Sequence, residues 1–225
     1  MKIVVTSHTA YRIPLEKFFQ SVDANSHSDS IYKQIILIIN GSEKDSIESD
    51  HRGTMIIHTQ LDVWEYTAFV VLDTYKTHPD IQSDYYFLLH DTCLLGRGFY
   101  PKLLANEQLA KQLNCEIMTN HLPCSNIIVI HKDVIYGFSK DVLKIQTKAN
   151  GCLIEQGLSL QDGTPSFYQK RKIHILGHRK EHHPIDVYKT GFRRTPFYYP
   201  VFDVMKYILW NKHGDFTNSV QNIFN

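Results

Sequence analysis

The sequence has no C-x-x-C pair, although it contains four cysteines, at positions 93, 115, 124 and 152. Zinc ribbons and thioredoxin-like redox sites both need closely spaced cysteine pairs, so neither is expected here. Scattered cysteines without such pairing are typical of proteins whose thiols stay reduced. The cysteine pattern therefore favours a cytosol-like compartment.

The sequence also lacks a charge excess and a long apolar run. The formal net charge is +1 and 21% of the residues are charged, so no bulk attraction toward nucleic acid is expected. No apolar run approaches the roughly 20 residues that cross a bilayer. The apolar start, Met1–Thr6, is too short for a signal peptide and is typical of a first strand. We therefore expect a cytoplasmic globular protein with no nucleic-acid partner and no transmembrane segment.

The most informative stretch is Ser83–Gly96. Within it, Tyr85–Leu89 is an unbroken apolar run, which is typical of a strand covered on both faces. The polar triplet His90-Asp91-Thr92 follows directly. Because ligands bind at the carboxyl ends of strands in open α/β sheets, Asp91 is expected to deliver a carboxylate to a binding site. The alternative is that Asp91 and Thr92 only begin a turn.

Other apolar runs alternate with amphipathic patterns through the first ninety residues. Strands are expected at 3–5, 34–39, 54–59 and 85–89, and helices at about 14–22 and 64–75. Buried strands separated by helices predict an α/β fold, with a mostly parallel central sheet flanked by helices.

Three of the expected strands end in polar residues. The carboxyl ends of parallel strands meet at one edge of a sheet. The sequence therefore predicts one site lined by Thr6, Ser7, His8, Asn40, Gly41, Ser42, His90, Asp91 and Thr92.

The second half of the chain is less regular. The pattern predicts a helix over 101–113, a strand over 126–130 and a helix that Ser139 caps and that runs to Lys148. A closing helix is predicted by the spacing of Val201, Val204, Met205, Ile208 and Leu209. Because no repeat or linker divides the sequence, we expect a single domain over residues 1–225.

Two of these segments resemble motifs of nucleotide-sugar glycosyltransferases of the GT-A fold. Ile38–Asp45 is similar to that family's strand end, which reads apolar-apolar-Asp-Asp/Asn-Gly-Ser-x-Asp, and Tyr86–Thr92 falls where the family has its D-x-D motif. Glu65 lies on the helix that would face the nucleotide. The resemblance covers residues 1–100, which it implies are a nucleotide-binding half, with an acceptor-side half and a carboxy-terminal flap over 101–225.

The resemblance implies transfer of a sugar from a UDP- or GDP-sugar to a carbohydrate or glycoprotein acceptor. A D-x-D motif binds a divalent ion, so Asp91 is expected to hold Mn²⁺ or Mg²⁺ beside His90 and Thr92. The motif is incomplete, because Asp91 is its only acid and Asn40 replaces another carboxylate. Metal-independent transfer, with cations in place of the ion, is the alternative.

Late residues supply further candidates for metal binding and charge neutralisation. The resemblance implies a carboxy-terminal histidine ligand, here His178 or His174, and His178-x-x-x-His182 has helical metal spacing that the following proline disfavours. The cations available for a diphosphate, or for an ordinary solvated basic surface, are Lys170, Arg171, Lys172, Arg179, Lys180, Arg193 and Arg194.

An inverting transferase needs a carboxylate base beside the acceptor hydroxyl. Glu155 is the first candidate, because it follows a short apolar segment flanked by glycines, and Asp133 and Asp162 are the others. The aromatic residues of 186–200 either line an acceptor groove or fold back to fill the core.

Two further functions remain open at this point. A nucleotide-sugar-binding protein without catalysis would fit the incomplete D-x-D motif. A metal-dependent hydrolase or nucleotidyltransferase would instead use the histidines together with Asp91.

Overall fold

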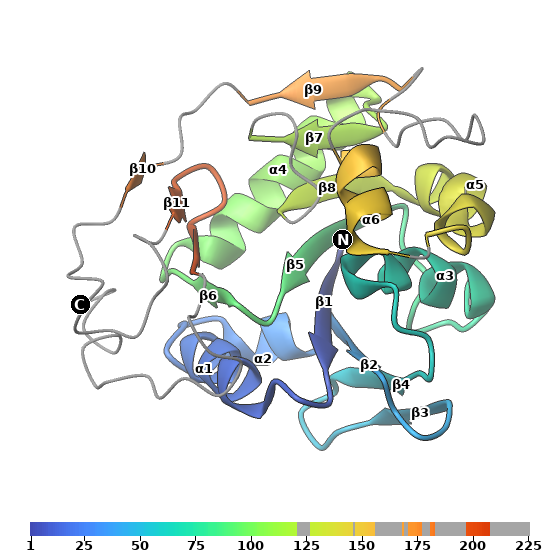
Figure 1. Cartoon of the computed structure of the whole chain (residues 1–225). Helices are drawn as coiled ribbons and strands as arrows, with labels where there is room; N and C mark the ends of the chain where they lie inside the picture. The colour runs from blue at the N-terminus through green and yellow to red at the C-terminus, as the bar shows by residue number, and fades with distance from the viewer. Residues whose placement is uncertain are drawn as a thin grey trace.

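The computed structural model (Figure 1) describes residues 1–120, 127–145, 147–155, 168, 171–176, 181–182 and 197–207. Side chains at 148, 149, 152, 155, 181 and 182 fall outside that description. No helix in these ranges is both long enough and apolar enough to cross a membrane.

The first ninety-five residues contain most of the central sheet. Their elements in chain order are β1 (Lys2–His8), α1 (Arg12–Asp23), α2 (Ser28–Tyr32), β2 (Ile35–Asn40), β3 (Ser46–Ser49), β4 (Met55–His58), the 3-10 helix η1 (Trp64–Tyr66), α3 (Thr67–Thr74), β5 (Tyr85–His90) and β6 (Cys93–Leu95).

The later elements complete this sheet and form a second, smaller one. They are α4 (Phe99–Leu113), β7 (Ile117–Thr119), β8 (Ile128–His131), α5 (Lys132–Val142), α6 (Lys148–Glu155), β9 (Ile173–Ile175), β10 (Glu181–His182), β11 (Phe197–Tyr199) and β12 (Val204–Lys206).

The central sheet has eight strands in the order β3-β4-β2-β1-β5-β8-β7-β9. Strands β4, β2, β1 and β5 run parallel, as their unbroken apolar runs predict. Strand β3 pairs antiparallel with β4, and β8 pairs antiparallel with β5. The expected α/β fold with a mostly parallel sheet flanked by helices is confirmed.

Each face of the sheet is covered by its own set of helices, as Figure 1 shows. Alternate residues of the central strands point to opposite faces. Val4, Ile36 and Leu88 pack in one buried cluster with residues of α3, α5 and α6. Val5 and Leu89, one residue further along, pack in a second cluster with residues of α1, α2 and α4. The strands are therefore buried on both sides, and only their ends are available for polar chemistry.

The second sheet has the order β10-β11-β12-β6. Its strand β12 pairs antiparallel with β6, so that Lys206 lies opposite Cys93 and Val204 lies opposite Leu95. The closing helix predicted from Val201 to Leu209 is wrong over the described residues, which end at 207. A turn with Asp203 in the left-handed region (φ 53°) leads into a strand there.

The aromatic residues at the end of the segment 186–200 fill the core. Tyr199 is 4% exposed and belongs to the buried cluster under α1 and α4, as does Phe202 just beyond it. For Tyr199, and for Phe197 which packs against the same cluster, the core-filling alternative is the correct one. Positions 186–196 lie outside the described residues.

Two local predictions differ from the structure. Ser139 caps no helix, since it lies inside α5 and its hydroxyl donates to Asp73 Oδ2 at 2.6 Å. The cap of α5 is His131, whose Nδ1 accepts from the Asp133 amide. The strand β3 was not predicted, because its polar sequence Ser46–Ser49 gives no apolar run.

Candidate functional site

The carboxyl ends of β1, β2 and β5 lie side by side at one edge of the sheet. In the parallel registers, Thr6 lies opposite His90 and His8 lies opposite Asn40. The predicted convergence of these three strand ends is therefore present. We call this group of strand ends the carboxyl edge.

The ends of β1 and β5 are joined by a hydrogen bond between side chains. The Ser7 hydroxyl donates to Asp91 Oδ2 at 2.6 Å, and the Asp91 amide donates to the Thr6 carbonyl at 3.2 Å. Ser7 and Asp91 are each 5% exposed. Asp91 is thus held against β1 instead of projecting freely from a turn.

The Asp91 carboxyl has an unusual acidity. Burial is the largest influence and raises its pKa from 3.8 to about 6, although the Ser7 hydroxyl, the Thr92 amide and the charge of Lys206 oppose the rise. A buried carboxyl with a perturbed pKa at a sheet edge is a functional-site candidate. Asp91 changes its charge close to neutral pH.

Two residues of the carboxy-terminal strand lie beside Asp91, and neither was expected from the sequence. Lys206 is close enough for its charge to lower the pKa of Asp91. Tyr207 is 1% exposed, and burial together with the charge of Asp91 raises its pKa. The Tyr207 amide donates to the Thr92 carbonyl at 3.1 Å. The only sequence signal for the position of Lys206 near the site was that it is the one charged residue in the segment 204–209.

The other half of the carboxyl edge is built around His8. Its Nδ1 accepts from the Ala10 amide at 3.0 Å, and its Nε2 lies 3.5 Å from Asp62 Oδ2. The ring covers Gly41, which has a φ of +67°, and a Cβ at Gly41 would lie 2.6 Å from His8 Nε2. The turn after β2 therefore needs glycine for both its backbone conformation and its contact with His8.

Replacing Gly41 by alanine should displace the His8 ring and cost about 1–3 kcal/mol of unfolding free energy. The matched control is Gly53→Ala. Gly53 also has a positive φ, +89°, but it lies in the turn before β4. This turn is at the amino end of β4, away from the carboxyl edge. Urea unfolding should show a loss for both variants. Only Gly41→Ala should also weaken ligand binding at the carboxyl edge. If the two variants bind the ligand equally well, His8 does not contribute to binding.

Asn40 is fixed beside a backbone of unusual conformation. Its Nδ2 donates to the Trp64 carbonyl at 2.9 Å, and Trp64 has a φ of 55°, which is rare for a large side chain. Among the described residues nothing donates to the buried Asn40 Oδ1. Buried acceptors without a donor are uncommon in folded proteins, and this one lies at the end of β2.

The remaining predicted residues of the edge are partly exposed. The Ser42 hydroxyl donates to the Ile39 carbonyl at 3.1 Å and lies 3.3 Å from His58 Nδ1, one strand beyond Asn40. Glu65 is half-buried in η1 next to Trp64. Both therefore lie on the β2–β4 side of the edge, away from Asp91.

The segment that carries Glu155 packs next to η1. The Tyr66 hydroxyl donates to the Gly151 carbonyl of α6 at 3.2 Å, and Ile154 is buried in the cluster beneath α3. The Glu155 side chain lies outside the described residues, as do Asp162 and His178.

Several other candidates lie away from Asp91. Asp133 begins α5, next to His131, which pairs with Tyr85 at the amino end of β5. Arg171 and Lys172 precede β9, where the Lys172 amide donates to Glu116 Oε2 at 2.7 Å. His174 lies on β9, which is three strands from β5. In their described positions Asp133, Arg171, Lys172 and His174 thus lie away from Asp91, and for Arg171 and Lys172 this agrees with the alternative of an ordinary basic surface. Lys170, Arg179, Lys180, Arg193 and Arg194 lie outside the described residues.

The donor set at the edge is poor for a metal ion. Among the described residues no group of three or more His, Cys, Asp or Glu side chains is placed to hold one. The Asp203 carboxylate accepts from the Gly98 amide at 2.7 Å and from the Tyr198 hydroxyl, so its oxygens are occupied. Asp91 is the one carboxylate among the residues described at the ends of β1 and β5.

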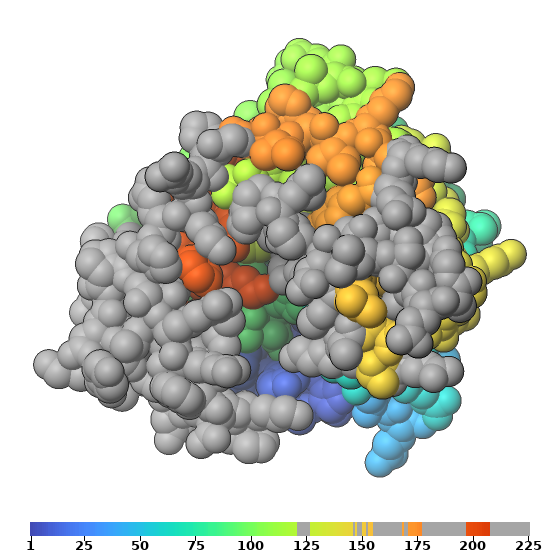
Figure 2. All heavy atoms as spheres, turned by 45° about the horizontal axis from the view of Figure 1, so that its top comes forward, coloured from blue at the N-terminus to red at the C-terminus, as the bar shows by residue number. Residues whose placement is uncertain are grey.

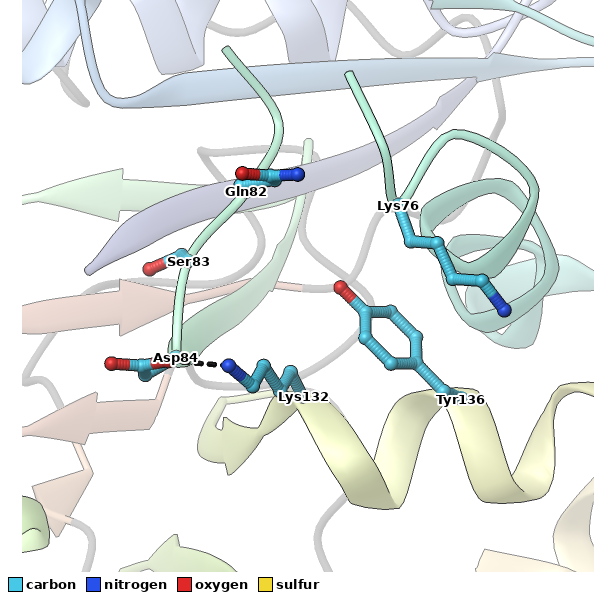
Figure 3. Close-up of a pocket in the computed structure, with 6 residues that line it drawn as sticks. All are labelled: Lys76, Gln82, Ser83, Asp84, Lys132 and Tyr136. Atoms are coloured by element: carbon cyan, nitrogen blue, oxygen red, sulfur yellow. Dashed lines mark hydrogen bonds and ion pairs between the residues drawn. The ribbon is translucent and has the colours of Figure 1, made fainter. Parts of the chain in front are cut away.

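A surface pocket of about 480 Å³ lies at the amino ends of the strands and not at the carboxyl edge. Figure 3 shows that Lys132 points toward Asp84, and these two side chains form an ion pair at 2.7 Å. Lys76, the other lysine in the lining, forms an ion pair with Asp73 at 3.0 Å. Both lysines of this pocket are therefore already neutralised by carboxylates.

Comparisons with known proteins give structural likenesses only. No family model and no curated protein matches the chain. One similar solved structure is a glycosyltransferase involved in the glycosylation of the major capsid of PBCV-1, with 13% identity, a TM-score of 0.46 and coverage of 78% of this chain and 83% of that one. Another is residues 1–349 of TarS from S. aureus, with 8% identity, a TM-score of 0.42 and coverage of 80% and 59%. Neither likeness is close enough to assign a function, which has to be argued from the geometry of this chain.

Proposed function

We propose that the carboxyl edge binds a nucleotide-diphosphate sugar and that the protein is a glycosyltransferase with a GT-A-like arrangement. The observation that supports this most is the hydrogen bond from Ser7 to Asp91. It joins the ends of two neighbouring parallel strands, which is where open α/β sheets bind nucleotides. A buried acid with a pKa of about 6 is a feature of sites, whereas a simple turn leaves its acid solvated.

The two halves of the edge suit different parts of a UDP- or GDP-sugar. The half around Asn40, at the end of β2, is proposed to lie next to the uracil or guanine base. His8, Gly41, Ser42 and Glu65 surround this part of the edge. Thr6, Ser7, His90, Asp91 and Thr92 form the half that would meet the diphosphate and sugar.

The chemistry requires stabilisation of the departing nucleoside diphosphate and removal of a proton from the acceptor hydroxyl. The diphosphate would be neutralised either by a divalent ion, Mn²⁺ or Mg²⁺, which would take Asp91 as its protein carboxylate and the diphosphate and water as further ligands, or by a fixed protein cation in place of the ion. If an ion is used, His178 is the proposed second ligand, and in either case Glu155 is the proposed base. The proposed acceptor is a carbohydrate or a glycoprotein.

A second candidate function is binding of the same donor without transfer. The single acid in the segment His90-Asp91-Thr92 favours it, because a complete D-x-D motif has two. A metal-dependent hydrolase or nucleotidyltransferase would need a preformed metal cluster, and the described residues contain none.

Calorimetry and thermal unfolding with UDP, GDP and ADP test donor binding. Saturation with the correct nucleotide at about 100 times Kd should raise Tm by about 5–10 °C. Ser7→Ala should remove most of this shift, while Ser139→Ala, which breaks a hydroxyl–carboxylate bond far from the edge, should bind normally. No shift with UDP or GDP would contradict the proposal.

Hydrolysis or transfer of the matching nucleotide sugar then separates the two candidates. A transferase should release nucleoside diphosphate from the donor, and Asp91→Ala should stop the release. Binding without release in the presence of a range of acceptor sugars would favour the non-catalytic function.

A further inference from the structure

Lys206 occupies a defined position beside the proposed donor site. It ends β12, directly opposite Cys93 of β6, and β6 begins two residues after Asp91. Side chains of paired residues in a sheet point to the same face. Cys93 packs on the face that is covered by α1 and α4, which is also the face of Val5 and Leu89. Lys206 therefore lies on the same side of the fold as Ser7 and Asp91.

The strand that presents Lys206 is held at several points. The Gly96 amide donates to the Asp203 carbonyl at 2.7 Å, and the Gly98 amide donates to Asp203 Oδ2 at 2.7 Å. The Lys102 ammonium donates to the Pro200 carbonyl at 2.6 Å. In Figure 2 the red-orange residues of this segment border a hollow beside the green of β5 and β6. Lys206 is thus fixed in place by its backbone.

Among the described residues, the Lys206 ammonium has no ion-pair partner of its own. It is partly exposed, and its charge acts on Asp91, yet no described carboxylate lies within ion-pair distance of it. By contrast, Lys76, Lys111, Lys132 and Lys144 each form an ion pair with an acid. An unpaired cation next to a buried acid is available to an anionic ligand.

We infer that Lys206 binds the diphosphate of the donor and neutralises it during transfer, so that the site works without a divalent ion. The inference rests on the proposed function. It is supported by two observations: the described ends of β1 and β5 offer a metal only one carboxylate, Asp91, and β12 places a cation without a described ion-pair partner beside that carboxylate. A fixed cation can stabilise a departing phosphate electrostatically as a metal ion does.

The step is a substitution at the anomeric carbon. The bond between that carbon and the diphosphate oxygen breaks, and its electron pair stays on the diphosphate, where the Lys206 ammonium donates a hydrogen bond to the new charge. The acceptor hydroxyl forms the new bond to the anomeric carbon, and its proton passes to a carboxylate, for which Glu155 is the candidate. Asp91 then accepts from a hydroxyl of the donor sugar instead of holding a metal.

Calorimetric titration of Lys206→Met with UDP and GDP, in EDTA and in MnCl₂, tests the inference. Loss of a charge-assisted hydrogen bond should weaken binding of the preferred diphosphate by about 10–100-fold. Binding of the matching nucleoside, uridine or guanosine, should not change. Lys206→Arg should restore diphosphate binding to within about fivefold, because the charge is retained. For the wild type, MnCl₂ should change the affinity less than about threefold.

Lys132→Met is the matched control. It removes a lysine from the opposite edge of the sheet and should leave diphosphate binding unchanged. Should Lys206→Met fail to fold by thermal unfolding, Lys206→Gln replaces it in the same titrations. Equal diphosphate affinity of the neutral variant and the wild type would overturn the inference, and so would an increase of more than about tenfold with MnCl₂. If the wild type binds neither UDP nor GDP, the proposed function itself fails.

Discussion

Replacing Asp91 by asparagine should stabilise the protein at pH 7.5 by about 2 kcal/mol, with an upper limit of about 3 kcal/mol. In the folded protein the carboxyl is 5% exposed, and burial raises its pKa from 3.8 to about 6. The charged form is therefore less favourable in the folded state than in the unfolded state. Asparagine is neutral, similar in shape and able to accept the hydrogen bond from Ser7.

The gain should depend on pH in a defined window. Well below pH 3.8 the Asp91 carboxyl is protonated in both states, so the two proteins should approach equal stability at the acid end of the range. Between pH 4 and 6 the folded wild type retains a proton that the unfolded chain has lost, and its stability falls as pH rises. The advantage of Asp91→Asn should therefore grow across this window and level off above about pH 6–7.

Urea unfolding of both proteins between pH 4 and 8 provides the measurement. The control is Asp84→Asn, which removes an exposed acid whose pKa is lowered by its hydrogen bond to Lys132. That variant should lose under about 1 kcal/mol, because exposed ion pairs contribute little. If Asp91 only begins a turn, Asp91→Asn should be neutral or destabilising at every pH, and the site assignment would lose its main support. If Asp91→Asn is more stable but no longer binds nucleotide, the Asp91 carboxylate lowers the stability of the fold and is needed for nucleotide binding.

The part of the fold that sequence predicts well is the part where local pattern and burial agree. The runs Ile35–Ile39 and Tyr85–Leu89 are apolar without interruption because each strand packs against helices on both faces. Polar residues stop each run where the sheet ends. The positions of Ser7, Asn40 and Asp91 at one edge follow from this pattern and from the parallel direction of the strands.

The carboxy-terminal part could not be predicted in the same way, because its structure depends on a distant partner. Val201, Val204 and Met205 have helical spacing, yet β12 forms because β6 offers it an unpaired strand edge. The spacing of apolar residues indicates which residues are buried. It does not distinguish a helix from this short strand, because both would bury the same residues. The placement of Lys206 beside Asp91 is a consequence of that pairing, so no local pattern pointed to it.

The predicted start of the helix at Ser139 was wrong for a similar reason. Serine is a common cap, and Ser139 stands ahead of a polar stretch, but the side chain of Asp73 on α3 satisfies its hydroxyl within α5. The cap that forms is His131, whose imidazole is a less frequent choice. Tertiary contacts thus decide which of several possible caps is used.

Among the glycines that the structure describes, Gly96 should be the most sensitive one for the arrangement of the donor site. A Cβ there would overlap all three carboxyl atoms of Asp203. The Asp203 side chain would have to move, and it would lose its hydrogen bonds from the Gly98 amide and the Tyr198 hydroxyl. Overpacking and two lost hydrogen bonds together should cost Gly96→Ala about 2–4 kcal/mol of unfolding free energy.

The same substitution should impair function, because Asp203 anchors the strand that presents Lys206. Gly96→Ala should weaken binding of the preferred nucleoside diphosphate about tenfold or more under conditions where the variant is still folded. Gly137→Ala is the control, since Gly137 lies in α5 with no atom within 4 Å of an added Cβ. Alanine there should stabilise the helix by up to about 1 kcal/mol and leave binding intact. Chemical unfolding and calorimetry of the two variants measure both effects. A Gly96→Ala protein that unfolds like the wild type and binds like it would show that the contact between Asp203 and the β6 turn does not position the site.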